Sequence, residues 1–130
     1  MTIGTLAQTS GATVDTIRFY EKRGLLPPPP RTAGGFRDYD EGAVARLAAI
    51  ARGKRLGFTL DEIRALLHWR EVGEDDAALV RSVAADRLAQ TERALADLAR
   101  QRDELAALVG ACGGAETPRH DCPILAEIAP

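Results

Sequence analysis

Long apolar runs are absent from this sequence, and so is a charged leader followed by one. No stretch approaches the ~18 consecutive apolar residues of a membrane span, so we expect a cytoplasmic protein that does not enter a membrane. Aromatic residues make up only 5% of the 130 residues, whereas alanine and leucine recur throughout. Because strands prefer aromatic and β-branched side chains, this composition predicts a mainly α-helical fold.

Residue patterns typical of enzymes are also missing. The sequence offers no paired carboxylates placed as acid and base, no nucleophile with an adjacent base, and no glycine-rich phosphate loop between a strand and a helix. We therefore expect a protein that is not an enzyme. With 130 residues, the chain is long enough for one small core plus an extended element.

Charge is unevenly distributed along the chain. Residues 1–70 contain 11 Lys/Arg and 7 Asp/Glu, whereas residues 71–130 contain 6 and 12. The overall charge of -2 therefore hides a basic first half and an acidic second half. Because a basic surface attracts a polyanion, we expect DNA to meet the first half only.

The first 26 residues predict a helix-turn-helix. Thr2 is placed to cap a short helix that ends at Ser10-Gly11, and Thr13 is placed to cap a second helix that Gly24 stops. Two short helices joined by a glycine-containing turn are typical of the motif that inserts its second helix into the DNA major groove. Phe19, on this second helix, is expected in the hydrophobic core.

A stiff spacer and a turn follow. The prolines at residues 27–30 cannot continue a helix, because proline lacks the amide hydrogen and fixes its own φ. Residues 31–39 then place Gly34-Gly35 between two short segments, which predicts a β-hairpin that serves as a wing. Cationic side chains on the second helix and the wing suit phosphates and groove edges. The residues that we expect to bind DNA are Thr13, Arg18, Tyr20, Lys22, Arg31, Arg37 and Tyr39.

Two further helices complete the first half. Asp40 is placed to cap a third helix whose apolar stripe begins at Val44. Residues 59–62, Thr-Leu-Asp-Glu, form a capping box that starts a fourth helix. The sequence therefore predicts a winged helix-turn-helix DNA-binding domain over residues 1–70 and an acidic connector over residues 71–76.

Residues 77–111 predict one long helix, since no proline interrupts them and their first glycine is Gly110. A helix of ~30 residues is ~45 Å long, which one small core cannot cover. An intramolecular bundle is the alternative, but the first half has no second long helix, so we favour homodimerisation through a coiled coil. The heptad-like seam consists of Ala84, Leu88, Thr91, Leu95, Leu98, Arg102, Leu105 and Val109.

The last segment, residues 112–130, is expected to be a loop followed by a short apolar helical turn. Two cysteines, Cys112 and Cys122, flank this loop. In a reducing compartment they are expected as free thiols that bind a thiophilic metal ion. Two sulfurs alone suit linear coordination of a monovalent ion, whereas zinc needs four donors, with His120, Asp121 and Glu116 as nearby candidates. A redox pair that closes a disulfide and two small buried apolar side chains remain the alternatives.

The run TIRFYEKRGLL at residues 16–26, with IGTLA at residues 3–7 and GFR at residues 35–37, closely resembles the MerR family of bacterial transcription regulators. The chain's AC at residues 111–112 and DCPIL at residues 121–125 are similar to the metal-sensing branch of that family, which includes copper, zinc, cadmium, lead and mercury regulators. The resemblance covers essentially the whole chain.

This resemblance implies a long antiparallel dimerisation helix with a metal-binding loop at each end. It also implies that the homodimer binds double-stranded promoter DNA whose two polymerase recognition elements are too far apart. Metal binding would let the dimer bend and untwist the DNA, so that bacterial RNA polymerase engages both elements.

The resemblance leaves the metal open. Where divalent-ion sensors of this branch usually have a cysteine and copper sensors usually a serine, this chain has Ala77, which disfavours a three-thiolate site. The nine residues between Cys112 and Cys122, with His120 among them, look more like zinc-sensing members. Because two thiolates complete a Cu(I) site but not a zinc site, we expect Cu(I), or the related Ag(I) or Au(I), with Zn(II) or another thiophilic ion as the alternative.

Overall fold

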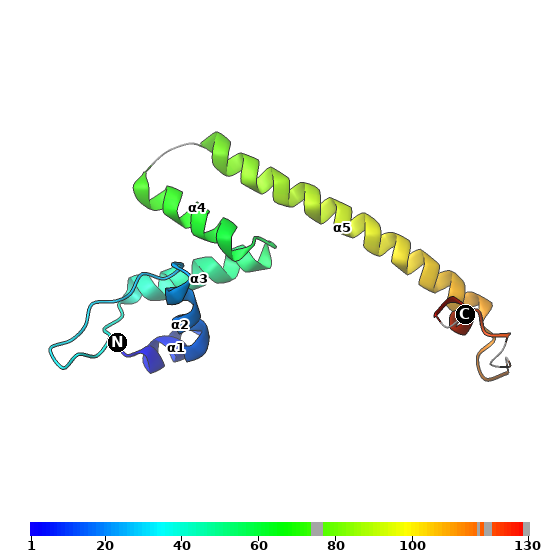
Figure 1. The fold of residues 1–130 in the computed structure, drawn as a ribbon, viewed down its shortest axis with the longest axis horizontal. Helices are drawn as coiled ribbons and strands as arrows, with labels where there is room; N and C mark the ends of the chain where they lie inside the picture. Colours follow the sequence, from blue (N-terminus) through cyan, green and yellow to red (C-terminus); the bar gives the residue numbers. More distant parts are fainter. Residues whose placement is uncertain (74–76, 117, 119–120, 129–130) are drawn as a thin grey trace. The chain divides into compact units, whose positions relative to one another are not determined.

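In the computed structural model the chain is helical over most of its length, as the composition predicted (Figure 1). The structure describes residues 1–73, 77–116, 118 and 121–128. The elements in these residues are α1 (Ile3–Ser10), α2 (Val14–Lys22), α3 (Glu41–Arg55), α4 (Leu60–Val72), α5 (Ala77–Ala111), the 3-10 helix η1 (Gly114–Glu116) and α6 (Pro123–Ile128). Contacts divide the chain into two units, Met1–Arg87 and Leu88–Pro130.

The helices of the first unit begin where the sequence predicted. The side chains of Thr2, Thr13, Asp40 and Thr59 each accept a backbone N–H bond of 3.1 Å from the residue three positions on. The carboxylate of Glu62 returns a 2.8 Å bond to the backbone N–H of Thr59, which completes the predicted capping box. Each cap stabilises its helix by roughly 1 kcal/mol.

The core of the first unit lies between α1, α2, α3 and α4, where α3 contacts both α1 and α4. At Gly53 the two helices α3 and α4 approach so closely that an added Cβ would lie 2.8 Å from Ile63 Cγ1. The buried side chains that form the core are Leu6, Ile17, Tyr20, Leu25, Leu26, Tyr39, Leu47, Ile50 and Ile63.

The expectation that Phe19 belongs to the core is wrong. Its side chain is 45% exposed, whereas Ile17 is fully buried and Tyr20 is 7% exposed. Residues three apart share a helix face and residues two apart do not. The buried face of α2 therefore passes through Ile17 and Tyr20, and Phe19 faces solvent.

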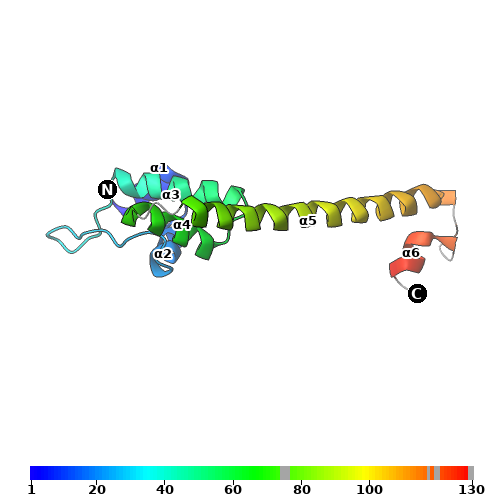
Figure 2. The same ribbon diagram turned by 90° about the horizontal axis from the view of Figure 1, so that it is seen from above.

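The wing between α2 and α3 (cyan) extends beyond the helices of this unit (Figures 1 and 2). Its turn forms as predicted, with Gly35 at φ 83° and its N–H donating to Thr32 O at 2.9 Å. The expected β-hairpin does not form; among the described wing residues there is one isolated bridge, between Arg31 and Arg37. The N–H of Asp38 donates to Pro30 O at 2.8 Å, but Pro30 has no N–H to return, so the ladder stops there.

The long helix α5 has the predicted bounds, Ala77–Ala111. None of its residues is buried in the single chain, and the apolar seam side chains Leu88, Leu95, Leu98, Leu105 and Val109 are 56–66% exposed. None of the described helices has the length and apolar character needed to cross a lipid bilayer.

The predicted connector begins later than expected. The helix α4 continues to Val72, and Gly73 ends it with φ 65°, so the first two residues of the expected connector are helical. Residues 74–76 lie outside the described residues. Because Arg87 of α5 pairs with Glu62 of α4 at 2.6 Å, the first turns of α5 belong to the same unit as the helices before them.

Candidate DNA-binding surface and cysteine pair

The exposed face of α2 carries two of the four predicted DNA-binding cations. Arg18 and Lys22 are exposed on this helix, and Thr13 caps its start, with its hydroxyl donating to Thr16 Oγ1 at 2.8 Å. Arg18, Phe19 and Lys22 line an open hollow of about 410 Å³ whose other lining residues are Asp15, Glu21 and Arg37. The surface of α2 thus joins that of the wing through Arg37.

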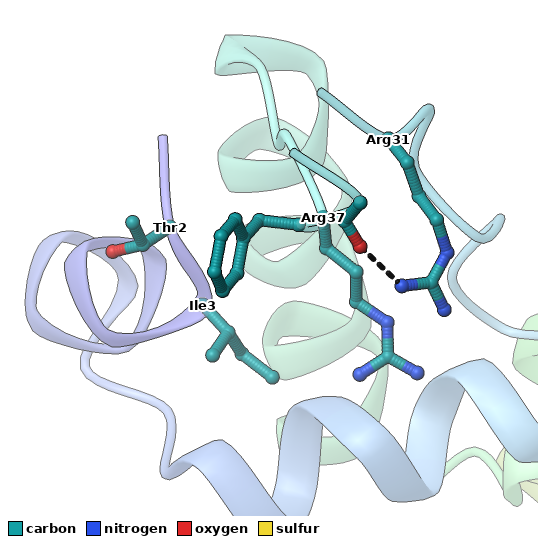
Figure 3. A pocket seen from close by; sticks show the side chains of 6 residues that line it. Thr2, Ile3, Arg31 and Arg37 are labelled. Carbon is teal, nitrogen blue, oxygen red and sulfur yellow. Dashed lines mark hydrogen bonds between the residues drawn. The ribbon is translucent and has the colours of Figure 1, made fainter. Parts of the chain in front are cut away.

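Two arginines of the wing extend this surface. Arg31 donates from Nη1 to Gly35 O at 2.7 Å, which orders its guanidinium across the turn. Thr2, Ile3, Arg31 and Arg37 are among the residues that line an open hollow of about 340 Å³. Figure 3 shows the two arginines on one side of it, with Thr2 and Ile3 at the start of α1 on the other. The structure thus brings Arg31 and Arg37 together, while their contact with DNA stays a prediction.

Glu21 organises the junction between α2 and the wing, and the sequence analysis missed it. Its carboxylate accepts a hydrogen bond from the Tyr39 hydroxyl and lies 3.4 Å from Arg37 Nη2. Burial and the bond to Glu21 raise the pKa of Tyr39 to about 12. The Glu21 side chain is only 9% exposed, so it holds Arg37 from inside the unit, while the Arg37 side chain itself stays 36% exposed.

The two tyrosines that were predicted to bind DNA are buried in the core of the first unit. Tyr20 is 7% exposed and Tyr39 is 2% exposed, and the Tyr39 hydroxyl is used by Glu21. The DNA contact predicted for these two residues stays a prediction. The side chains that the structure leaves accessible on this surface are Thr13, Arg18, Lys22, Arg31 and, in part, Arg37.

The two cysteines lie side by side in the second unit. Both are free and half-buried, and their Sγ atoms are 3.5 Å apart. The pKa of the Cys122 thiol is lowered, chiefly by a bond from the backbone N–H of Leu125 and then by its bond with Cys112. A lower pKa favours the thiolate, which is the form that binds metals.

The separation of the sulfurs fits a shared ion. At a metal–sulfur distance of about 2.3 Å, two sulfurs 3.5 Å apart subtend about 100° at the ion, close to a tetrahedral angle. Linear coordination at the same bond length needs about 4.6 Å between them. The pair therefore suits bent coordination as it stands, and opens by about 1 Å for linear coordination.

A fuller donor set does not appear in the part of the chain that the structure describes. There, no group of three or more His, Cys, Asp or Glu side chains lies close enough to hold a metal ion. His120, the predicted possible ligand, lies outside the described residues, so its role stays a prediction.

Comparison with known proteins identifies the family. The profile of the MerR HTH family regulatory proteins matches residues 1–68, and that of the MerR DNA-binding region matches residues 44–108. This chain belongs to the MerR family. It is therefore a DNA-binding transcription regulator and not an enzyme, as the absence of catalytic patterns predicted.

Three similar proteins illustrate the relationship. The mercuric resistance operon regulatory protein of Serratia marcescens is 38% identical over 128 residues, which cover 98% of this chain and 87% of that protein. The crystal structure of PbrR691 from Ralstonia metallidurans, in complex with lead(II), has a TM-score of 0.85 and 37% identity over 99% of both chains. HiNmlR, a MerR family regulator lacking the sensor domain and bound to promoter DNA, has a TM-score of 0.60 and 25% identity over 85% of this chain and 83% of its own.

Two features of this MerR chain were missed in the sequence analysis, the exposure of Phe19 and the role of Glu21, and only the first can be inferred from a local sequence pattern. The exposure of Phe19 could have been inferred from the helical periodicity, because Phe19 is two positions from the apolar Ile17 and residues two apart do not share a helix face. The role of Glu21 had no local signal, since its partners Arg37 and Tyr39 are 16 and 18 positions away along the chain.

Proposed function

We propose that this MerR family member is a metal-responsive transcription regulator. Its homodimer binds promoter DNA through α2 and the wing, and a thiophilic ion held by Cys112 and Cys122 activates transcription. The observation that carries the proposal is the pair of free thiols, with Sγ atoms 3.5 Å apart, in a chain whose other unit has a cationic helix-turn-helix surface.

Accessible cations support the DNA-binding part of the proposal. Arg18 and Lys22 lie on the exposed face of α2, and Arg31 and Arg37 continue that face on the wing. Guanidinium and ammonium groups neutralise phosphates and fix the register of a protein on the duplex. The structure of HiNmlR bound to promoter DNA supports the same use of this fold.

The exposed seam of α5 supports the homodimer. Five large apolar side chains, more than half exposed in the single chain, follow one another along it at heptad spacing. A second copy of the same helix covers them with an identical surface, which is how a two-fold symmetric interface forms. We propose that promoter DNA and bacterial RNA polymerase meet this dimer, rather than a monomer.

We keep Cu(I) as the proposed inducer, because the described residues supply two thiol donors and Cu(I) is satisfied by two. A divalent ion is the second candidate. The present sulfur separation suits bent coordination, and similar proteins are named for mercury and contain lead(II). With a divalent ion, His120 or a partner chain must supply further donors.

The test exposes the protein to each of Cu(I), Ag(I), Zn(II), Cd(II), Hg(II) and Pb(II). Two quantities are measured for each ion: transcription from the cognate promoter and the metal content of the purified dimer. Cys112→Ala and Cys122→Ala are expected to keep operator affinity and lose the response. Glu127→Ala, exposed on α6, is the matched control and keeps both.

His120→Ala separates the two metal candidates. With a two-thiolate Cu(I) site it leaves the copper response unchanged, and with a zinc-type site it weakens the zinc response. Full responses to every ion in both cysteine variants would exclude metal sensing by this pair. Loss of both free thiols after mild oxidant, together with a transcription response and no bound metal, would instead support thiol-based redox or electrophile sensing.

A further inference from the structure

We propose that Phe19 contacts the C5-methyl groups of thymines in the major groove and so selects the DNA sequence, beside the cations of α2 that bind phosphates. This inference rests on the proposed DNA-binding surface and assigns to it a residue that selects sequence rather than one that holds phosphates. The ring is 45% exposed on the face of α2 opposite the fully buried Ile17.

The side chains around the Phe19 ring suit the chemical groups of a DNA major groove. Phe19 lies in the open hollow whose other lining residues are three cations and two carboxylates: Arg18, Lys22, Arg37, Asp15 and Glu21. Because Glu21 pairs with Arg37 at 3.4 Å, Arg18 and Lys22 are the two cations beside the ring that are left for phosphates. The cations suit phosphates, but the ring has nothing to gain from a phosphate. In the major groove the apolar feature is the C5-methyl group of thymine, which phenylalanine contacts.

The ring is also held in place before DNA arrives. The Arg23 guanidinium lies 5.7 Å from its centroid, and the ring of Tyr20, which belongs to the core, lies 6.0 Å away. Arg23 itself is tied to α4, because its Nη2 lies 3.7 Å from Asp61 Oδ1 and its carbonyl accepts a 3.1 Å bond from Arg64. A side chain fixed in this way loses little conformational freedom on binding, which favours it as a specificity contact.

The chemistry of the ring argues for DNA over a protein partner. A hydrophobic protein interface depletes charge at its centre, whereas this ring shares its hollow with five charged side chains, Arg18 and Lys22 among them. Covering the ring with apolar protein would desolvate Arg18 and Lys22 as well, which is costly for charged groups. A duplex covers the ring with a methyl group and the cations with phosphates at the same time.

The test removes the methyl group from the DNA. An operator selected by the protein from a random duplex library is resynthesised with each thymine in turn replaced by uracil, which lacks only the C5-methyl. Wild-type protein is expected to lose about fourfold in affinity at one or two positions per half-site, the value of burying one methyl group. Substitutions at the remaining thymines leave affinity unchanged.

The variant Phe19→Ala is expected to bind the unmodified operator more weakly and to lose the thymine–uracil difference at those same positions. Its dependence on salt concentration stays that of the wild type, since no phosphate contact is removed. Phe36→Ala, which removes a ring 74% exposed on the wing, is the matched control and keeps the difference.

The outcomes separate this inference from the proposed function. If the wild type binds its operator and no uracil substitution lowers affinity, the inference is wrong and the DNA-binding proposal stands. The uracil scan uses unmodified protein, so it decides this point even if Phe19→Ala fails to fold. If the wild type selects no operator, the proposed function fails and the inference falls with it.

Discussion

Shortening one seam leucine should weaken the dimer by a predictable amount. Complete burial of a leucine side chain contributes about 1.5–3 kcal/mol, and Leu95 is 62% exposed in the single chain. Covering that exposed part in a dimer therefore contributes about 1–2 kcal/mol per chain, and about 2–4 kcal/mol for the two copies. Because 1.4 kcal/mol corresponds to tenfold in Kd, Leu95→Ala is expected to raise the dimer Kd by about 30-fold to 700-fold.

Sedimentation equilibrium over a range of protein concentrations measures this Kd directly. Arg93→Ala is the matched control, since Arg93 is also exposed on α5 but lies two positions from Leu95, off the seam. Circular dichroism checks that both variants keep their helices. An unchanged Kd in Leu95→Ala, or a wild type that stays monomeric at every concentration, would show that the seam is not the dimer interface.

The remaining predictions concern three titrating side chains. Hydrogen bonds from the backbone of Thr59, foremost, and from Arg87 lower the pKa of Glu62 below its usual 4.5. The contribution of Glu62 to the stability of the folded protein is therefore full above pH 4.5 and is lost as the pH falls through the lower pKa of the folded state. Glu62→Gln should cost about 1.5–3 kcal/mol at neutral pH and reduce the acid dependence of urea unfolding; an identical pH profile in both proteins would contradict this. Burial raises the pKa of Tyr39 to about 12, so its contribution to the free energy of unfolding is full below pH ~10 and is lost toward pH 12. Tyr39→Phe should remove that loss of stability at alkaline pH in unfolding experiments. A wild-type protein in which both tyrosines titrate near ~10 would count against this. The lowered pKa of Cys122 predicts that its alkylation, followed by peptide mass mapping against pH, has its midpoint below 9; a midpoint at 9 or above would exclude the lowering.

What the sequence predicts well here is local. A capping side chain and the N–H that it binds are three residues apart, so the starts of the helices at Thr2, Thr13, Asp40 and Thr59 could be predicted from spacing alone. The bounds of α5 could also be predicted locally, because no proline interrupts residues 77–111 and their first glycine is Gly110, one residue before the end. The cysteine pair could be anticipated because a short loop joins Cys112 to Cys122.

What the sequence predicts poorly depends on distant contacts. The wing pattern indicated a hairpin, but the missing N–H of Pro30 stops the ladder at one bridge, and only the register of Pro30 against Asp38 reveals this. The bond from the Tyr39 hydroxyl to Glu21 is another such contact, because no local pattern contains this pairing; the predicted DNA contact of Tyr39 stays a prediction. The donor set around the sulfurs stays open for a related reason, since a partner chain can complete it.

The central claim is that an ion bound by Cys112 and Cys122 controls transcription by a DNA-bound dimer. Transcript yield from the cognate promoter, measured with purified RNA polymerase while the inducing ion is titrated, tests it most directly. We predict that the wild type raises the yield as about one ion binds per cysteine pair, and that Cys122→Ala, bound to the operator with unchanged affinity, gives no rise. A full rise in Cys122→Ala and in Cys112→Ala would contradict the account.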